Sequence, residues 1–102
     1  MSKNSKTKNT EKLWQALEQA HQAPQEAEMV HLSNLTEEDT DRLAKAWPEL
    51  LPEARRQIIE SLATMAENDF ELDFNGIFRL ALQDQDAVVR ATAIESLWED
   101  ED

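Results

Sequence analysis

The sequence predicts an all-α protein, a right-handed stack of helix pairs (an α-solenoid) with about five helices. One observation is an internal near-copy: P-E-A-R-R-Q-I-I-E-S-L at 52–62 aligns with A-V-V-R-A-T-A-I-E-S-L at 87–97 at a shift of 35 residues. In addition, apolar residues recur three and four apart in several segments, which is the spacing of one helix face. Strands are not needed, because no segment shows a sustained alternation of apolar and polar residues, Tyr is absent and Gly occurs once.

The first part of the chain predicts one helix between two irregular segments. Residues 1–9 are polar and basic, which is typical of a disordered tail. A helix is expected over Thr10–Gln22, because Thr10 can cap it and an apolar stripe that includes Trp14 follows. Residues 23–34 contain Pro24 and indicate a linker.

The second and third helices have clear boundary signals. Thr36 precedes three acidic residues, which the positive end of a helix dipole favours, so a helix is expected to begin there. Pro48 predicts that this helix ends near Trp47. Pro52 suits the first turn of a third helix, which is expected to run to about Asn68.

The last two helices repeat this pattern further along the chain. A fourth helix is expected to start near Asp73, and a fifth to open at Asp86 and to bury Val89, Ala93 and Leu97. The expected divisions are a tail at 1–9, an N-terminal helix and linker at 10–35, and a body at 36–102 with helix pairs at 36–68 and 70–100.

Composition restricts the function more than any motif does. The 102 residues carry a net charge of -12 and include no Cys, which excludes disulfides and thiolate chemistry. No apolar run approaches the roughly 20 residues of a membrane span, and no secretory signal is visible, so a cytoplasmic protein is expected. An acidic body repels nucleic acid and anionic membranes, and this favours a protein partner with a basic or apolar surface.

The segment L-A-L-Q-D-Q-D-A-V-V-R-A-T-A-I-E-S-L at 80–97 resembles a HEAT repeat of the short bacterial kind, the phycobilisome-lyase type. The resemblance lies in an acidic turn, a Val-Arg pair at the start of the second helix, and Ala and Leu on its buried side. The unit at 43–62 is similar but weaker, since Ala54 and Arg55 stand where Val-Arg is expected. Such repeats scaffold partners, and some assist chromophore attachment to phycobiliproteins.

The same resemblance implies a structural ladder of ion pairs. In HEAT-like repeats, a turn acid and the Arg six residues later form bonds between adjacent units. Glu49 and Arg55 have this spacing, and so do Asp84 and Arg90. We therefore expect these four residues to lock neighbouring helix pairs together, and we expect Arg90→Ala to lower the melting temperature.

The candidate partner-binding residues are Glu60, Glu95, Ile94 and Trp98. Glu60 and Glu95 occupy equivalent positions on the acidic surface of the second helices. Ile94 and Trp98 lie in the last helix, where a further repeat would normally cover them. We therefore expect that the chain is the N-terminal part of a longer array, or that a partner or a second copy covers this open end.

No arrangement of residues predicts an enzyme, a metal site or a cofactor. The stretch 71–76 imitates the start of a calcium loop, but the acid required at its twelfth position is replaced by Leu82. His21 and His31 lack the spacing of metal ligands, and Ser61 and Ser96 have no His beside them.

The sequence therefore predicts a non-enzymatic protein-interaction module or scaffold. Two alternatives stay open. One is an accessory factor in chromophore attachment to a phycobiliprotein-like partner, which only the resemblance suggests. The other is an acidic mimic of nucleic acid that inhibits a basic protein, which the net charge of -12 suggests.

Overall fold

The structure is a computed structural model that describes residues 10–100, so the expected tail at 1–9 lies outside the described residues. All regular elements in the described part are helices, which confirms the all-α class. In chain order they are α2 (Glu11–Trp14), π-helix η2 (Gln15–Gln19), α3 (Glu26–Met29), 3₁₀-helix η3 (Val30–Leu32), α4 (Glu37–Ala46), 3₁₀-helix η4 (Trp47–Glu49), α5 (Pro52–Asn68), α6 (Asn75–Ala81) and α7 (Ala87–Asp100).

The N-terminal helix differs from the expected run over residues 10–22. After Trp14 it widens into the π-helix η2, in which the backbone N–H of Ala20 donates to the carbonyl of Gln15. The helix then stops because His21 adopts a left-handed backbone with a φ of 53°. The expected linker at 23–34 is itself partly helical, since it contains α3 and η3.

The later helices begin and end close to where their sequence signals lie. The Thr36 hydroxyl accepts a hydrogen bond from the backbone N–H of Asp39 at 3.1 Å, which caps α4. The chain tightens into η4 at Pro48, as expected for a residue that cannot continue an α-helix. Helix α5 begins at Pro52 and ends at Asn68, which are the predicted boundaries.

The internal repeat of the sequence is also present in the helix boundaries. Helices α4 and α6 end at Ala46 and Ala81, and helices α5 and α7 begin at Pro52 and Ala87. Each of these pairs is separated by the same 35 residues as the two copies in the sequence. We call α4 with α5 the first unit, and α6 with α7 the second unit.

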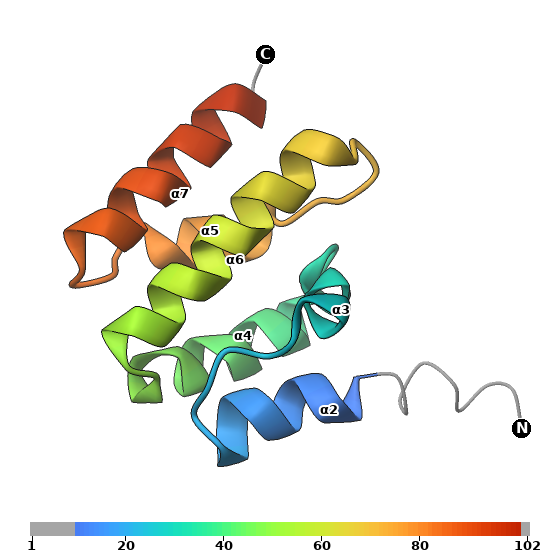
Figure 1. Cartoon of the computed structure of the whole chain (residues 1–102), viewed down its shortest axis with the longest axis vertical. Coiled ribbons are helices and arrows are strands. Elements are labelled where there is room, and N and C mark those ends of the chain that lie inside the picture. Colours follow the sequence, from blue (N-terminus) through green and yellow to red (C-terminus); the bar gives the residue numbers. More distant parts are fainter. Residues whose placement is uncertain (1–9, 101–102) are drawn as a thin grey trace, which may run out of the picture.

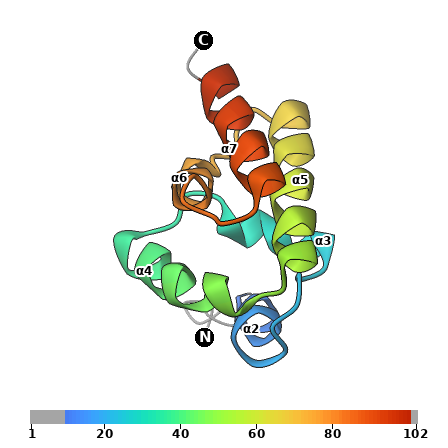
Figure 2. The same cartoon turned by 90° about the vertical axis from the view of Figure 1, so that its left-hand side faces the viewer.

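The two units stack with equivalent helices in contact. Helix α6 packs against α4, and α7 packs against both α5 and α6. Figure 1 shows α7 beside α5, with α2 at the opposite end of the molecule, and Figure 2 shows the same order from the side. The second unit therefore has one side against the first unit, whereas the outward side of α7 faces away from it.

The N-terminal segment covers the other end of the stack. Trp14 and Leu17 are buried in the same core as residues of both units. The guanidinium of Arg42 lies 4.1 Å from the centre of the Trp14 ring and donates two hydrogen bonds to the Glu18 carboxylate, at 2.7 and 2.8 Å. These contacts hold the N-terminal helix to α4. Among residues 10–100, no helix has the length and apolar character needed to cross a membrane.

Candidate protein-interaction surface

Helix α7 carries the candidate residues Ile94, Glu95 and Trp98. The carboxylate of Asp86 caps its first turn by accepting hydrogen bonds from the N–H groups of Val88 and Val89, at 2.9 and 3.1 Å. An acid at this position also suits the positive end of the helix dipole. The start of helix α7 is therefore fixed by a capping residue of its own unit.

Helix α7 is apolar on two sides. Its inner side packs into the core through Val89 and Ala93, with Leu97 partly buried beside them. A second apolar row faces solvent, and we call it the outer face of α7. It consists of Ala87, Ala91, Ile94 and Trp98.

The two large residues of the outer face are strongly exposed. Ile94 is 53% exposed and Trp98 is 73% exposed. The row has a four-three-four spacing, which is that of a seam between two packed helices. Two large apolar side chains are therefore exposed side by side on the same face of one helix.

The first unit shows how the equivalent positions are covered within the chain. Ile59 corresponds to Ile94 and is fully buried on α5. Ala63 corresponds to Trp98 and lines a hollow of about 390 Å³ together with Ser96 and Glu99 of α7. This side of α5 therefore faces α7, whereas the same side of α7 has no helix against it in residues 10–100.

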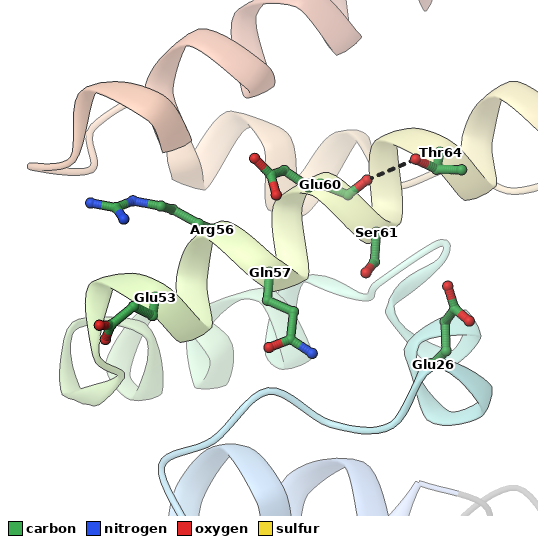
Figure 3. Close-up of a pocket in the computed structure, with 7 residues that line it drawn as sticks. All are labelled: Glu26, Glu53, Arg56, Gln57, Glu60, Ser61 and Thr64. Atoms are coloured by element: carbon green, nitrogen blue, oxygen red, sulfur yellow. Dashed lines mark hydrogen bonds between the residues drawn. The ribbon is translucent and has the colours of Figure 1, made fainter.

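Glu60 and Glu95 are exposed but lie in different settings. Glu95 stands beside the outer face of α7. Glu60 lines an open hollow of about 480 Å³ between α3 and α5, together with Glu26 and Glu53 (Figure 3). The structure therefore places Ile94, Glu95 and Trp98 on one helix and separates Glu60 from them.

The cation in this hollow is already engaged by the second unit. The Arg56 guanidinium lies 2.6 Å from a carboxylate oxygen of Asp86. This hydrogen bond, together with those from Val89 and Val88 and the charge of Arg56, lowers the pKa of the Asp86 carboxyl to about 2. The sequence reasoning named Asp86 as the start of the fifth helix, but it did not pair this residue with Arg56.

A buried ion pair joins the two units. The Arg55 Nε donates to the Asp84 carboxylate at 2.8 Å, and the indole N–H of Trp47 donates to the same oxygen at 2.7 Å. The side chains of Arg55 and Asp84 are only 10% and 2% exposed. A further N–H of Arg55 donates to the carbonyl of Leu50. Asp84 therefore connects the second unit to both η4 and α5.

The other two residues of the expected ladder are not in ion pairs within residues 10–100. Arg90 donates to the main-chain carbonyl of Asp84 at 2.8 Å, inside its own unit. Glu49 is exposed, and Arg55 binds Asp84 of the second unit instead. Trp47 is the member that sequence reasoning missed. Its burial on an apolar stripe was a usable signal, because the N–H of a buried Trp usually requires a hydrogen-bond acceptor.

The described residues offer no metal centre. No three His, Asp or Glu side chains among residues 10–100 converge on one point. In the calcium-loop imitation, the carboxylate of Asp73 instead accepts the backbone N–H of Asn75 at 3.0 Å. Local turn formation therefore accounts for the position of this acid.

Comparisons of this chain with family models, with curated proteins and with solved structures find no match.

Proposed function

We propose that this protein is a non-enzymatic protein-interaction module, built from two HEAT-like helix pairs, that binds a partner through the outer face of α7. The observation that carries the proposal is the contrast between two equivalent isoleucines. Ile59 lies one turn before Ala63 on α5 and is fully buried, whereas Ile94 is 53% exposed. Within residues 10–100, a position that is buried in the first unit is thus exposed in the second unit.

The chemistry of the outer face supports binding to protein. Trp98 is a large amphipathic side chain, the type that most often dominates the energy of protein interfaces. Ala87 and Ala91 are small and leave room for side chains of a partner beside Ile94 and Trp98. All four residues lie on one helix, so no backbone segment has to fold before a partner can contact them.

The proposal is tested by affinity capture from an extract of the source cells, at low and at high salt. The wild-type chain is compared with Trp98→Ala and with Phe70→Ala, which removes an even more exposed aromatic ring outside α7. We expect a partner that Phe70→Ala and high salt retain and that Trp98→Ala loses. Retention by Trp98→Ala would refute the outer face as the binding surface. Visible absorbance of the captured complex would reveal a tetrapyrrole-bearing partner.

A second function is favoured by the acidic hollow in Figure 3. Three glutamates line it, and its cation Arg56 is paired with Asp86. We propose as the alternative that this surface imitates nucleic acid and occupies the binding site of a basic protein. Such binding depends on long-range charge, so it is lost at high salt and does not require Trp98. The same capture experiment therefore separates the two functions.

A further inference from the structure

We propose that the partner contributes an amphipathic α-helix with basic residues along one edge, and that this helix lies along the outer face of α7. The proposal rests on the proposed function, because it names the chemistry of the partner for the same surface. Three properties of the partner segment follow from separate observations: it is helical, its buried side is apolar, and it is positively charged where it meets Glu95.

The helical form follows from the first unit. The side of α5 that bears Ile59 and Ala63 is covered by a helix, α7 itself. Ile94 and Trp98 occupy the equivalent positions on α7, 35 residues later. The spacing of Ala87, Ala91, Ile94 and Trp98 is also that of a helix–helix seam. Both observations favour another helix as the occupant of this surface.

The apolar side of the partner helix follows from the sizes of the side chains on the outer face of α7. Ala87 and Ala91 leave space at one end of the row, and Ile94 and Trp98 project at the other. A partner helix with large aliphatic side chains at three- and four-residue spacing fills that space and covers the indole ring. Burial of Trp98 and Ile94 then supplies the main favourable free energy of binding.

The positive charge of the partner helix follows from the acidic residues beside the outer face of α7. Glu95 and Glu99 are exposed, and Arg90 is the only basic residue in α7. One N–H of Arg90 is already engaged by the main-chain carbonyl of Asp84. A second copy of this chain would bring its own Glu95 and Glu99, along with a further net charge of -12. A basic helix from another protein complements this edge better than a second copy does.

The test uses the full chain and synthetic peptides as defined probes. The first peptide is as long as α7, with leucines at helix-face spacing and lysines beside them. The second has glutamate in place of every lysine, and the third has the composition of the first in an order that breaks the apolar face. Binding is measured by calorimetry and by fluorescence. Because Trp14 and Trp47 are buried, a shift of the emission to shorter wavelength reports on Trp98.

We expect the lysine peptide to bind one-to-one and the other two to bind much more weakly. Trp98→Ala is expected to weaken binding by about tenfold or more, as truncation of a central aromatic residue does. Phe70→Ala is the matched control and is expected to leave binding unchanged. Glu95→Lys combined with Glu99→Lys is expected to shift the preference from the lysine peptide to the glutamate peptide. Both positions are exposed, so these variants are expected to keep the fold.

Several results would overturn the inference. These are no binding of the lysine peptide, equal binding of all three peptides, or binding that Trp98→Ala leaves unchanged. Sedimentation of the protein alone gives a further check, since a dimer that Trp98→Ala dissociates would assign the surface to a second copy. If Trp98-dependent capture succeeds while the peptide fails, only the basic helix is rejected. If both fail, the proposed function is rejected as well.

Discussion

Asp84→Ala is expected to be among the most destabilising single changes in this chain. The substitution removes a carboxylate whose side chain is 2% exposed and that accepts hydrogen bonds from Arg55 and Trp47. Arg55 is then left with a nearly buried positive charge and with the carbonyl of Leu50 as its remaining acceptor. The indole N–H of Trp47 loses its acceptor as well.

The size of the effect follows from the burial of this pair. Removing one partner of a buried ion pair lowers the free energy of unfolding by about 3–5 kcal/mol. The whole stability of a domain of this size is about 5–15 kcal/mol. The melting temperature is therefore expected to fall by at least roughly 12 °C, since about 1 kcal/mol corresponds to roughly 4–8 °C in a small domain.

Urea denaturation followed by circular dichroism measures this loss, with Trp emission as a second probe of the same transition. Arg90→Ala is the comparison, because it removes a hydrogen bond to a carbonyl from a partly exposed side chain and is expected to lose only about 1–2 kcal/mol. Arg55→Met with Asp84→Asn removes both charges and keeps an acceptor for Trp47. This double variant is expected to be more stable than Asp84→Ala.

Two results would refute this reasoning. One is a loss below about 1 kcal/mol for Asp84→Ala, since a buried guanidinium without a counter-ion should be far more unfavourable than that. The other is a loss for Arg90→Ala that equals or exceeds that of Asp84→Ala. Either would mean that contacts within the second unit, rather than the bond between units, hold this turn in place.

Three further outcomes are expected. Ile59→Ala should lower the free energy of unfolding by about 2–5 kcal/mol in urea denaturation, whereas Ile94→Ala should change it by no more than about 0.5 kcal/mol; equal losses would mean that the outer face of α7 is covered. The folded-state pKa of Asp86, about 2, lies below its usual 3.8, so its pairing stabilises the fold above about pH 4, and this contribution disappears as the pH falls toward 2. In acid titrations, the free energy of unfolding of Asp86→Asn should therefore fall less over that range than that of the wild type. An unchanged pH profile would contradict the pairing. Arg42→Ala should lower the free energy of unfolding by about 1 kcal/mol and speed amide hydrogen exchange in the N-terminal helix. Exchange as slow as in the wild type would show that core packing alone holds that helix.

The helices of the two units could be predicted because their signals are local. Pro52 begins α5 where the sequence indicates, and the near-copy 35 residues later places the start of α7. The π-helix after Trp14 could not be predicted, because its residues, Gln-Ala-Leu-Glu-Gln, are equally good in an ordinary α-helix. Helix α3 lies in a polar segment whose structure depends on packing of Met29 rather than on a local pattern.

The residues of the outer face of α7 and of the buried ion pair were predictable to different degrees. Exposed apolar positions such as Ile94 and Trp98 followed from the order of the repeats. The resemblance identified Arg55 and Asp84 as ladder residues, but its six-residue spacing grouped Arg55 with Glu49 and Asp84 with Arg90, whereas Arg55 in the structure pairs with Asp84. The contribution of Trp47 to that pair was not predicted, because an indole on an apolar stripe indicates burial but does not reveal which acceptor its N–H will reach across 37 positions of chain.

The bond between Asp84 and the first unit also has a consequence for synthesis of the protein. A ribosome delivers α4 and α5 before it delivers the turn that contains Asp84. During that interval, Arg55 and Trp47 lack the carboxylate that both require in the finished fold. Until residue 84 has emerged, two buried donors of the first pair of helices therefore lack their acceptor, and we expect this pair to be less stable alone than in the finished fold.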